Sequence, residues 1–139
     1  MSSGLSNLAI ESMLNHMFAT GTYSKPAGHK LHLHVADPHA SGAEVDVVVD
    51  DTAYAEQTIT FDDEGDTADK RVYNDALITF PAVVYGTGAA AYDVTHWSVQ
   101  DGSGVLMAAG PLPTTVTRNA GEPMALNIGA IYIELERTA

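Results

Sequence analysis

Hydrophobic residues recur at helical spacing in one segment near the start of the chain. In residues 5–18 (LSNLAIESMLNHMF) the apolar positions follow the i, i+3, i+4, i+7, i+8 pattern of an amphipathic helix: Ile10, Met13, Leu14, Met17 and Phe18. Ser6 stands just before this stripe and is a suitable N-cap. The pattern therefore predicts one short α-helix over about residues 5–18, which ends before the turn-rich segment at Gly21.

From Lys30 onward the period of the pattern changes to two. Apolar and polar residues alternate, or apolar residues cluster, in short runs bounded by turn residues: 30–36 (KLHLHVA), 44–50 (EVDVVVD), 57–61 (QTITF) and 76–83 (ALITFPAV). The segments 114–126 and 128–136 are expected to form a closing pair of strands. About seven to eight such strands predict a mainly β chain, folded as a single antiparallel β-sandwich domain over residues 1–139 with the helix at its N-terminus.

A hairpin is predicted at residues 94–112 (VTHWSVQDGSGVLMAAGPL). Two apolar runs flank Asp101, Gly102, Ser103 and Gly104, where glycines supply positive φ and the aspartate binds its own backbone. Trp97 shares a strand face with Val99, which favours a place in the core or in a subunit interface over a sugar-stacking platform.

Composition excludes several classes of function. The chain has 18 Asp and Glu against 6 Lys and Arg, a net charge of −12, so a basic face for nucleic acid or for an anionic membrane surface is not expected. No apolar run approaches the roughly 20 residues of a membrane-spanning helix. The start of the chain lacks the basic and apolar blocks of a signal peptide, so we expect a soluble product kept inside the cell that makes it. Without cysteine there are no disulfides or thiolate ligands.

Two clusters are candidate metal sites. His32 and His34 lie at i, i+2 on one strand face, with His29, Asp37 and His39 nearby, and imidazoles with a carboxylate suit a transition metal. A polar strand face that meets solvent or another subunit explains the same pattern. The acidic segment 61–70 (FDDEGDTADK) offers oxygens for calcium, but it lacks the EF-hand spacing and is better explained as a solvated loop. The expectation is therefore no metal and no cofactor.

No pattern for catalysis is present. The residues around Ser103 do not form a nucleophile elbow, and His96 and Asp101 have no triad spacing. The glycines at 86, 88 and 102 lack the strand–loop–helix context of a phosphate loop. No catalytic residue is predicted, and a metal-dependent enzyme that uses His32 and His34 is the weakest of the alternatives.

The order of segments along the chain resembles a known family. It combines an opening helix (LSNLAIESMLNHMF), a turn (GTYSKPA), a strand and turn (LHLHVADP), a tyrosine segment (TAYAEQTITF), a strand (ITFPAV), the hairpin above and an ending (VTRNAGEPMALNIGAIYIEL). Together these segments resemble the small tailed-bacteriophage virion proteins known as phage tail fibre proteins. The chain departs from that pattern at Asp50, Asp51 and Thr52, where the family usually has glycines.

The resemblance implies a non-enzymatic structural component of the phage particle, assembled in the host cytoplasm. We expect it to self-associate as a cyclic homo-oligomer, of which a trimer is one form, and to dock on other virion proteins of the capsid or tail. The expected contact residues are Ile10, Met13, Leu14, Met17 and Trp97, unless these form the protomer's own core. The alternative is a host-surface receptor or glycan-binding module, in which Tyr85 and Tyr92 and the loops 85–92 and 37–44 would make the contact.

Overall fold

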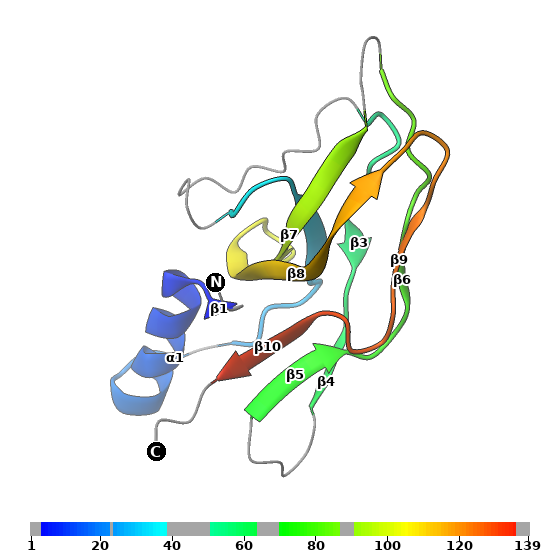
Figure 1. The fold of residues 1–139 in the computed structure, drawn as a ribbon. Coiled ribbons are helices and arrows are strands. Elements are labelled where there is room, and N and C mark those ends of the chain that lie inside the picture. Colours follow the sequence, from blue (N-terminus) through cyan, green and yellow to red (C-terminus); the bar gives the residue numbers. More distant parts are fainter. Residues whose placement is uncertain (1–3, 23, 39–50, 64–69, 87–90, 136–139) are drawn as a thin grey trace.

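The computed structural model describes residues 4–22, 24–38, 51–63, 70–86 and 91–135. Within these ranges the chain forms one α-helix and ten β-strands (Figure 1). The elements in chain order are β1 (Gly4–Leu5), α1 (Asn7–Phe18), β2 (Lys30–His34), β3 (Gln57–Thr58), β4 (Phe61–Asp63), β5 (Lys70–Asn74), β6 (Ile78–Phe80), β7 (Tyr92–Gln100), β8 (Leu106–Arg118), β9 (Met124–Leu126) and β10 (Tyr132–Leu135). The mainly β fold with one N-terminal helix is confirmed.

The strands form three antiparallel sheets. The largest has the order β1-β8-β7-β2-β3, a second has the order β10-β5-β4, and β6 pairs with β9. The five-stranded sheet lies across from the two smaller sheets in a sandwich-like arrangement (Figure 1). The long hairpin β7–β8 is the centre of the large sheet, and β2 pairs with β7 over its whole length.

The hydrophobic core lies between these sheets. Leu31 and Leu33 of β2 stand opposite Val99 and Trp97 of β7 and share one sheet face with them. The buried cluster contains residues of the five-stranded sheet, of the pair β6–β9, and of the segments next to the third sheet: Leu31, Leu33, Ile59, Ile78, Phe80, Val94, Trp97, Val99, Ala108, Leu112, Met124, Leu126 and Ile131. The Trp97 side chain is 2% exposed and belongs to the protomer's core.

The hairpin turn forms largely as its sequence predicts. The Asp101 carboxylate accepts hydrogen bonds from the backbone N–H groups of Ser103 (2.8 Å) and Val105 (3.0 Å). Gly104 has a φ of +81°, a conformation that glycine adopts without steric cost. Gly102 serves a different purpose. Its N–H donates to the Ala27 carbonyl, and an added Cβ would lie 2.9 Å from that oxygen, so the position requires close backbone approach.

Some strand predictions were incomplete or wrong. The expected closing pair does not form, because β9 pairs with β6 and β10 pairs with β5. Residues 114–118 instead extend β8. Strand β5 was not predicted. It begins with Lys70 and Arg71 directly after an acidic segment, and such a run of charged residues is typical of a solvated loop. The predicted strand 44–50 lies outside the described residues.

Candidate functional site

Helix α1 presents an apolar stripe to solvent. The Ser6 hydroxyl caps its start by accepting a hydrogen bond from the Ala9 N–H at 3.1 Å, as predicted. Ala9 is the buried residue of the helix, and Met13 is half-buried. The remaining apolar side chains of the stripe are largely exposed: Ile10 40%, Leu14 52%, Met17 66% and Phe18 78%. We call these four residues the helix stripe; they do not belong to the protomer's core.

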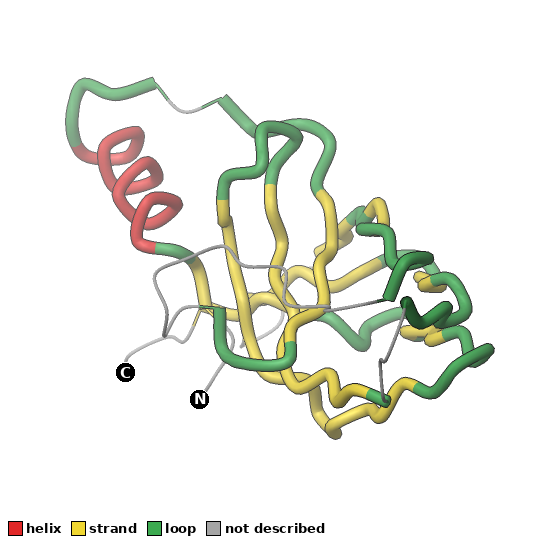
Figure 2. The backbone as a smooth tube through the Cα atoms, turned by 90° about the horizontal axis from the view of Figure 1, so that it is seen from above, coloured by secondary structure: helices red, strands yellow, loops and turns green. Residues whose placement is uncertain are grey.

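The helix stands at one end of the molecule, beside β1 and β8, and most of its surface projects away from the sheets (Figure 2). It is 12 residues long. No helix within the described ranges has both the length and the apolar content to cross a membrane.

The two candidate metal-binding histidines are buried in the five-stranded sheet. His32 is 7% exposed and His34 is fully buried, so neither imidazole is an exposed group. His32 Nε2 lies 3.0 Å from the Glu56 carboxylate, and His34 Nε2 lies 2.6 Å from the Ser98 hydroxyl. The two rings stack with centroids 6.5 Å apart. Their contacts explain both histidines as parts of the sheet's polar packing.

Among the described residues, the others considered for metals form no ligand group with this pair. The His29 ring packs edge-on against Phe61, with centroids 6.3 Å apart. His39 and residues 64–69 of the acidic segment lie outside the described residues. Across the described ranges, no group of three or more His, Asp or Glu side chains is arranged to hold a metal ion.

An open groove lies between residues 25–29 and residues 58–61. Lys25 and His29 line it together with Thr58, Thr60 and the Phe61 ring. Its described lining contains no carboxylate that could work with the histidine as an acid–base pair.

A buried polar cluster joins segments that are far apart in the sequence. The Arg118 guanidinium lies 3.5 Å from the Asp51 carboxylate, and the Tyr92 hydroxyl donates to that carboxylate at 2.8 Å. Arg118 Nη1 donates to the Tyr92 hydroxyl at 2.9 Å, and Nη2 donates to the Pro81 carbonyl at 2.5 Å. The second Asp51 oxygen accepts from the backbone N–H of Val84 at 3.1 Å. The ion pair is shielded from water. Removing either charged group would therefore leave the other one buried without a countercharge.

Tyr85 and Tyr92, the tyrosines of the receptor-binding alternative, both make hydrogen bonds to this cluster. The Tyr92 hydroxyl is held between Asp51 and Arg118, and the Tyr85 hydroxyl donates to the Arg118 carbonyl at 2.6 Å. Both side chains are half-buried. Their polar ends are therefore committed to internal hydrogen bonds, and the two tyrosines serve to join the loops to β8. Residues 87–90 of the proposed loop, and most of the loop 37–44, lie outside the described residues.

The cluster makes stability depend on pH in the alkaline range. Burial, and then the hydrogen bond to Asp51, raise the pKa of Tyr92 well above its ordinary value. A raised pKa in the folded state means that the folded chain retains a proton that the unfolded chain loses. Tyr92 therefore adds stability below about pH 10, the ordinary tyrosine pKa, and this contribution is lost as pH rises further.

We expect Tyr92→Phe to reduce this alkaline loss of stability. The measurement is the urea midpoint of wild type and variant at about pH 8 and about pH 11, on either side of the ordinary tyrosine pKa. Because the chain has six tyrosines, the comparison between the two proteins isolates the contribution of Tyr92. Equal pH dependence in both proteins would contradict the assigned role.

Comparison with known protein families identifies the group to which the chain belongs. Residues 4–134 match the family described as Podophage GP4 fiber I protein gp80. No curated protein matches the chain. The match covers the helix, all ten strands of the described residues except the end of β10, and the buried polar cluster. The chain therefore belongs to the family of podophage GP4 fiber I protein gp80, and it is a phage fibre protein, a structural component of the virion.

Proposed function

We propose that the chain is a non-enzymatic fibre subunit that associates with further copies of itself through the helix stripe and docks on other proteins of the phage particle. The observation that carries the proposal is the stripe itself: Ile10, Leu14, Met17 and Phe18 expose apolar surface side by side on one helix. Contiguous exposed apolar surface on a folded protein is typical of an interaction site.

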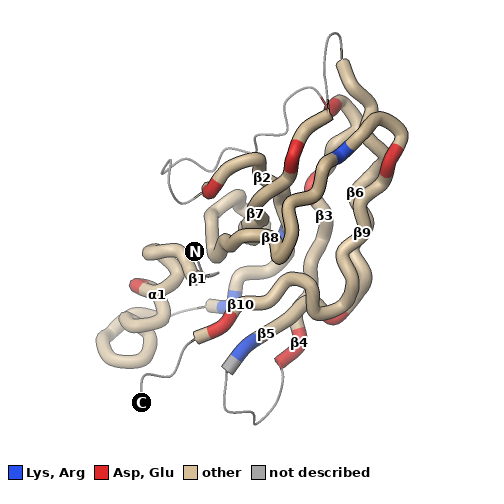
Figure 3. Tube along the Cα trace, in the orientation of Figure 1, with Lys and Arg blue, Asp and Glu red and all other residues tan. Residues whose placement is uncertain are grey.

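The low charge of the helix allows contact with a second copy of the chain. Each copy has a net charge of −12, so two copies repel one another where their acidic surfaces meet. Helix α1 carries Glu11 as its single Asp, Glu, Lys or Arg residue, whereas acidic positions are spread over the strands and loops elsewhere (Figure 3). The helix is therefore a surface on which acidic copies can pack with little electrostatic cost.

The test is the mass of the assembly in solution. We expect wild type to sediment as a closed oligomer, and the double variant Leu14→Glu/Met17→Glu to sediment as a monomer, because buried carboxylates in an apolar contact are costly to desolvate. The matched control is Ile128→Glu, which changes an equally exposed apolar residue away from the helix and should leave the oligomer intact. Analytical ultracentrifugation over a range of concentrations measures all three proteins.

A wild-type protein that stays monomeric at high concentration, or a double variant with an unchanged mass, would overturn the proposal. The position on the particle is tested separately by gold-labelled antibody on intact virions. Label along the tail or its fibres supports the fibre subunit, whereas label spread over the head indicates a capsid-decorating subunit.

A further inference from the structure

The open groove has two walls that are joined at its base. The Ile59 N–H of one wall donates a hydrogen bond to the His29 carbonyl of the other at 3.2 Å. The His29 ring also packs edge-on against the Phe61 ring. The Ala27 carbonyl accepts from the Gly102 N–H at 3.1 Å, which ties its wall to the turn between β7 and β8. The groove is therefore shaped within one copy, before any partner binds.

The groove is mostly apolar and is not filled by the helix of its own copy. Its volume is about 650 Å³, within the range of roughly 300–1,000 Å³ that is typical of clefts which receive a ligand. Pro26, Ala27, Ile59 and Phe61 supply the apolar part of its described lining, and none of its described lining residues comes from α1. A cleft of this size can receive two or three side chains of one helix face.

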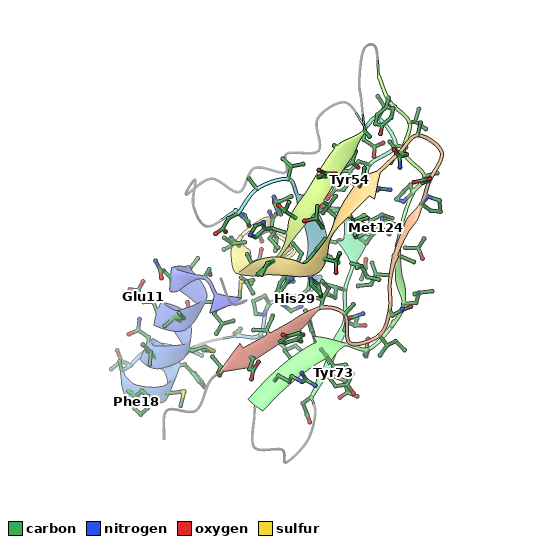
Figure 4. The ribbon with its side chains drawn as sticks, viewed as in Figure 1. Glu11, Phe18, His29, Tyr54, Tyr73 and Met124 are labelled. Atoms are coloured by element: carbon green, nitrogen blue, oxygen red, sulfur yellow. The ribbon has the colours of Figure 1, made fainter. Side chains whose placement is uncertain are left out.

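The helix stripe has the pattern that such a groove receives. Its residues lie at i, i+4, i+7 and i+8, the spacing at which one face of an amphipathic helix anchors in an apolar groove. Phe18, the most exposed of them at 78%, is labelled on the helix at one side of the molecule, and His29 is labelled nearer the centre (Figure 4). One copy therefore offers both surfaces, and they are separate from one another.

The charges of the two surfaces are complementary. The described lining of the groove includes Lys25 and His29 and no Asp or Glu, on a chain with 18 acidic residues against 6 basic ones. Asp75, whose carboxylate accepts from the Thr60 hydroxyl, is outside that lining. The last turn of a helix has backbone carbonyls without an intrahelical partner and carries partial negative charge. Lys25 therefore suits the end of α1, where half of the stripe lies.

We infer that the helix stripe of one copy docks in the open groove of the next copy. The inference rests on the proposed self-association through the stripe and names the surface that receives it. Because the two surfaces differ, each copy gives its helix to one neighbour and its groove to another. Such a contact closes a ring when the rotation between copies divides a full turn. A contact of stripe on stripe would instead join only two copies.

The experiment places a carboxylate in the groove and compares the result with the helix variant. Ala27→Glu changes an exposed residue of the lining, and Ala125→Glu, at an exposed position of β9 outside the lining, is the matched control. In analytical ultracentrifugation we expect Ala27→Glu to weaken self-association about tenfold or more, as Leu14→Glu/Met17→Glu does, because a carboxylate is costly to desolvate in an apolar contact. Ala125→Glu should assemble as wild type does.

A mixture of the two disrupted variants tests the contact directly. The groove of Leu14→Glu/Met17→Glu and the helix of Ala27→Glu are both intact. An equimolar mixture should therefore form a complex of two copies, although each variant alone is a monomer. Lys25→Glu, a change at an exposed side chain of the lining, is a second groove variant, and circular dichroism shows whether each variant is folded.

The outcomes separate this inference from the proposal on which it rests. A mixture of doubled mass supports the docking of helix in groove. If wild type is a monomer, the proposed self-association fails and the inference fails with it. If wild type assembles and the folded groove variants assemble equally well, the docking inference is wrong, while self-association through the stripe is retained. Folded monomeric variants whose mixture stays monomeric would also overturn the inference.

Discussion

Replacing Asp51 with alanine is expected to destabilise the fold by about 3–5 kcal/mol, the range observed when one partner of a buried ion pair is removed. The substitution leaves the Arg118 guanidinium buried without its countercharge. It also removes the acceptor for the N–H groups of Ala53 and Val84 and for the Tyr92 hydroxyl. Since a domain of this size is stable by about 5–15 kcal/mol, the loss is a large fraction of the total. Urea unfolding at neutral pH measures it.

A matched control tests whether the burial of Asp51 is responsible for the expected loss of stability. Asp93 also accepts a side-chain hydrogen bond, from the Thr117 hydroxyl, but it is exposed. We expect Asp93→Ala to change the free energy of unfolding by less than about 1 kcal/mol. The double variant Asp51→Ala/Arg118→Met should be more stable than Asp51→Ala alone, because it no longer buries an unpaired charge. Equal effects of Asp51→Ala and Asp93→Ala would show that the cluster does not stabilise the fold as inferred.

Replacing Trp97 with alanine is expected to cost about 3–5 kcal/mol, as for other large core side chains, because it leaves a cavity that the surrounding residues do not fill. Trp97 is 2% exposed and lies on β7, the central strand of the large sheet, opposite Leu33 of β2. Denaturant unfolding followed by circular dichroism measures the loss. Leu77→Ala, at an exposed position, should change stability by less than about 0.5 kcal/mol.

The same residue distinguishes core from interface. Trp97 is the single tryptophan of the chain, so its fluorescence reports on one environment. If it is a core residue, dissociating the proposed oligomer by dilution leaves the emission spectrum unchanged. A shift of the emission to longer wavelength on dilution would mean that the ring becomes solvated when copies separate, and it would return Trp97 to the list of subunit contacts.

Features that depend on neighbours in the sequence were predictable. The helix was expected at about residues 5–18 and is observed at Asn7–Phe18, with Ser6 as its cap. The hairpin β7–β8 was predicted because Asp101 and Gly104 form the turn within a few residues of one another. In both cases the interactions that select the structure join residues that are only a few positions apart in the sequence.

Features that depend on residues far apart were not predictable in the same way. Asp51 and Tyr92 are 41 residues apart, and Tyr92 and Arg118 are 26 apart. Nothing in the spacing of these residues marks them as partners, so Tyr92 was interpreted as a loop residue available to a receptor. The predicted pairing of the last two segments was wrong for the same reason. Alternation identifies which face of a strand is apolar, but it does not determine which other strand that strand pairs with.

The mainly β class, the position of the helix, the central hairpin and the resemblance to phage fibre proteins follow from the sequence, because helical spacing and turn chemistry depend on residues that are close together in the chain. Which apolar and polar groups are covered follows from the packing of the strands. This packing buries Trp97, His34 and Arg118, leaves Phe18 and Met17 in solvent, and places Tyr73 beside Tyr132 on an exposed sheet face. Burial depends on how the sheets pack, because the exposure of a side chain is set by its contacts with residues that are distant in the sequence.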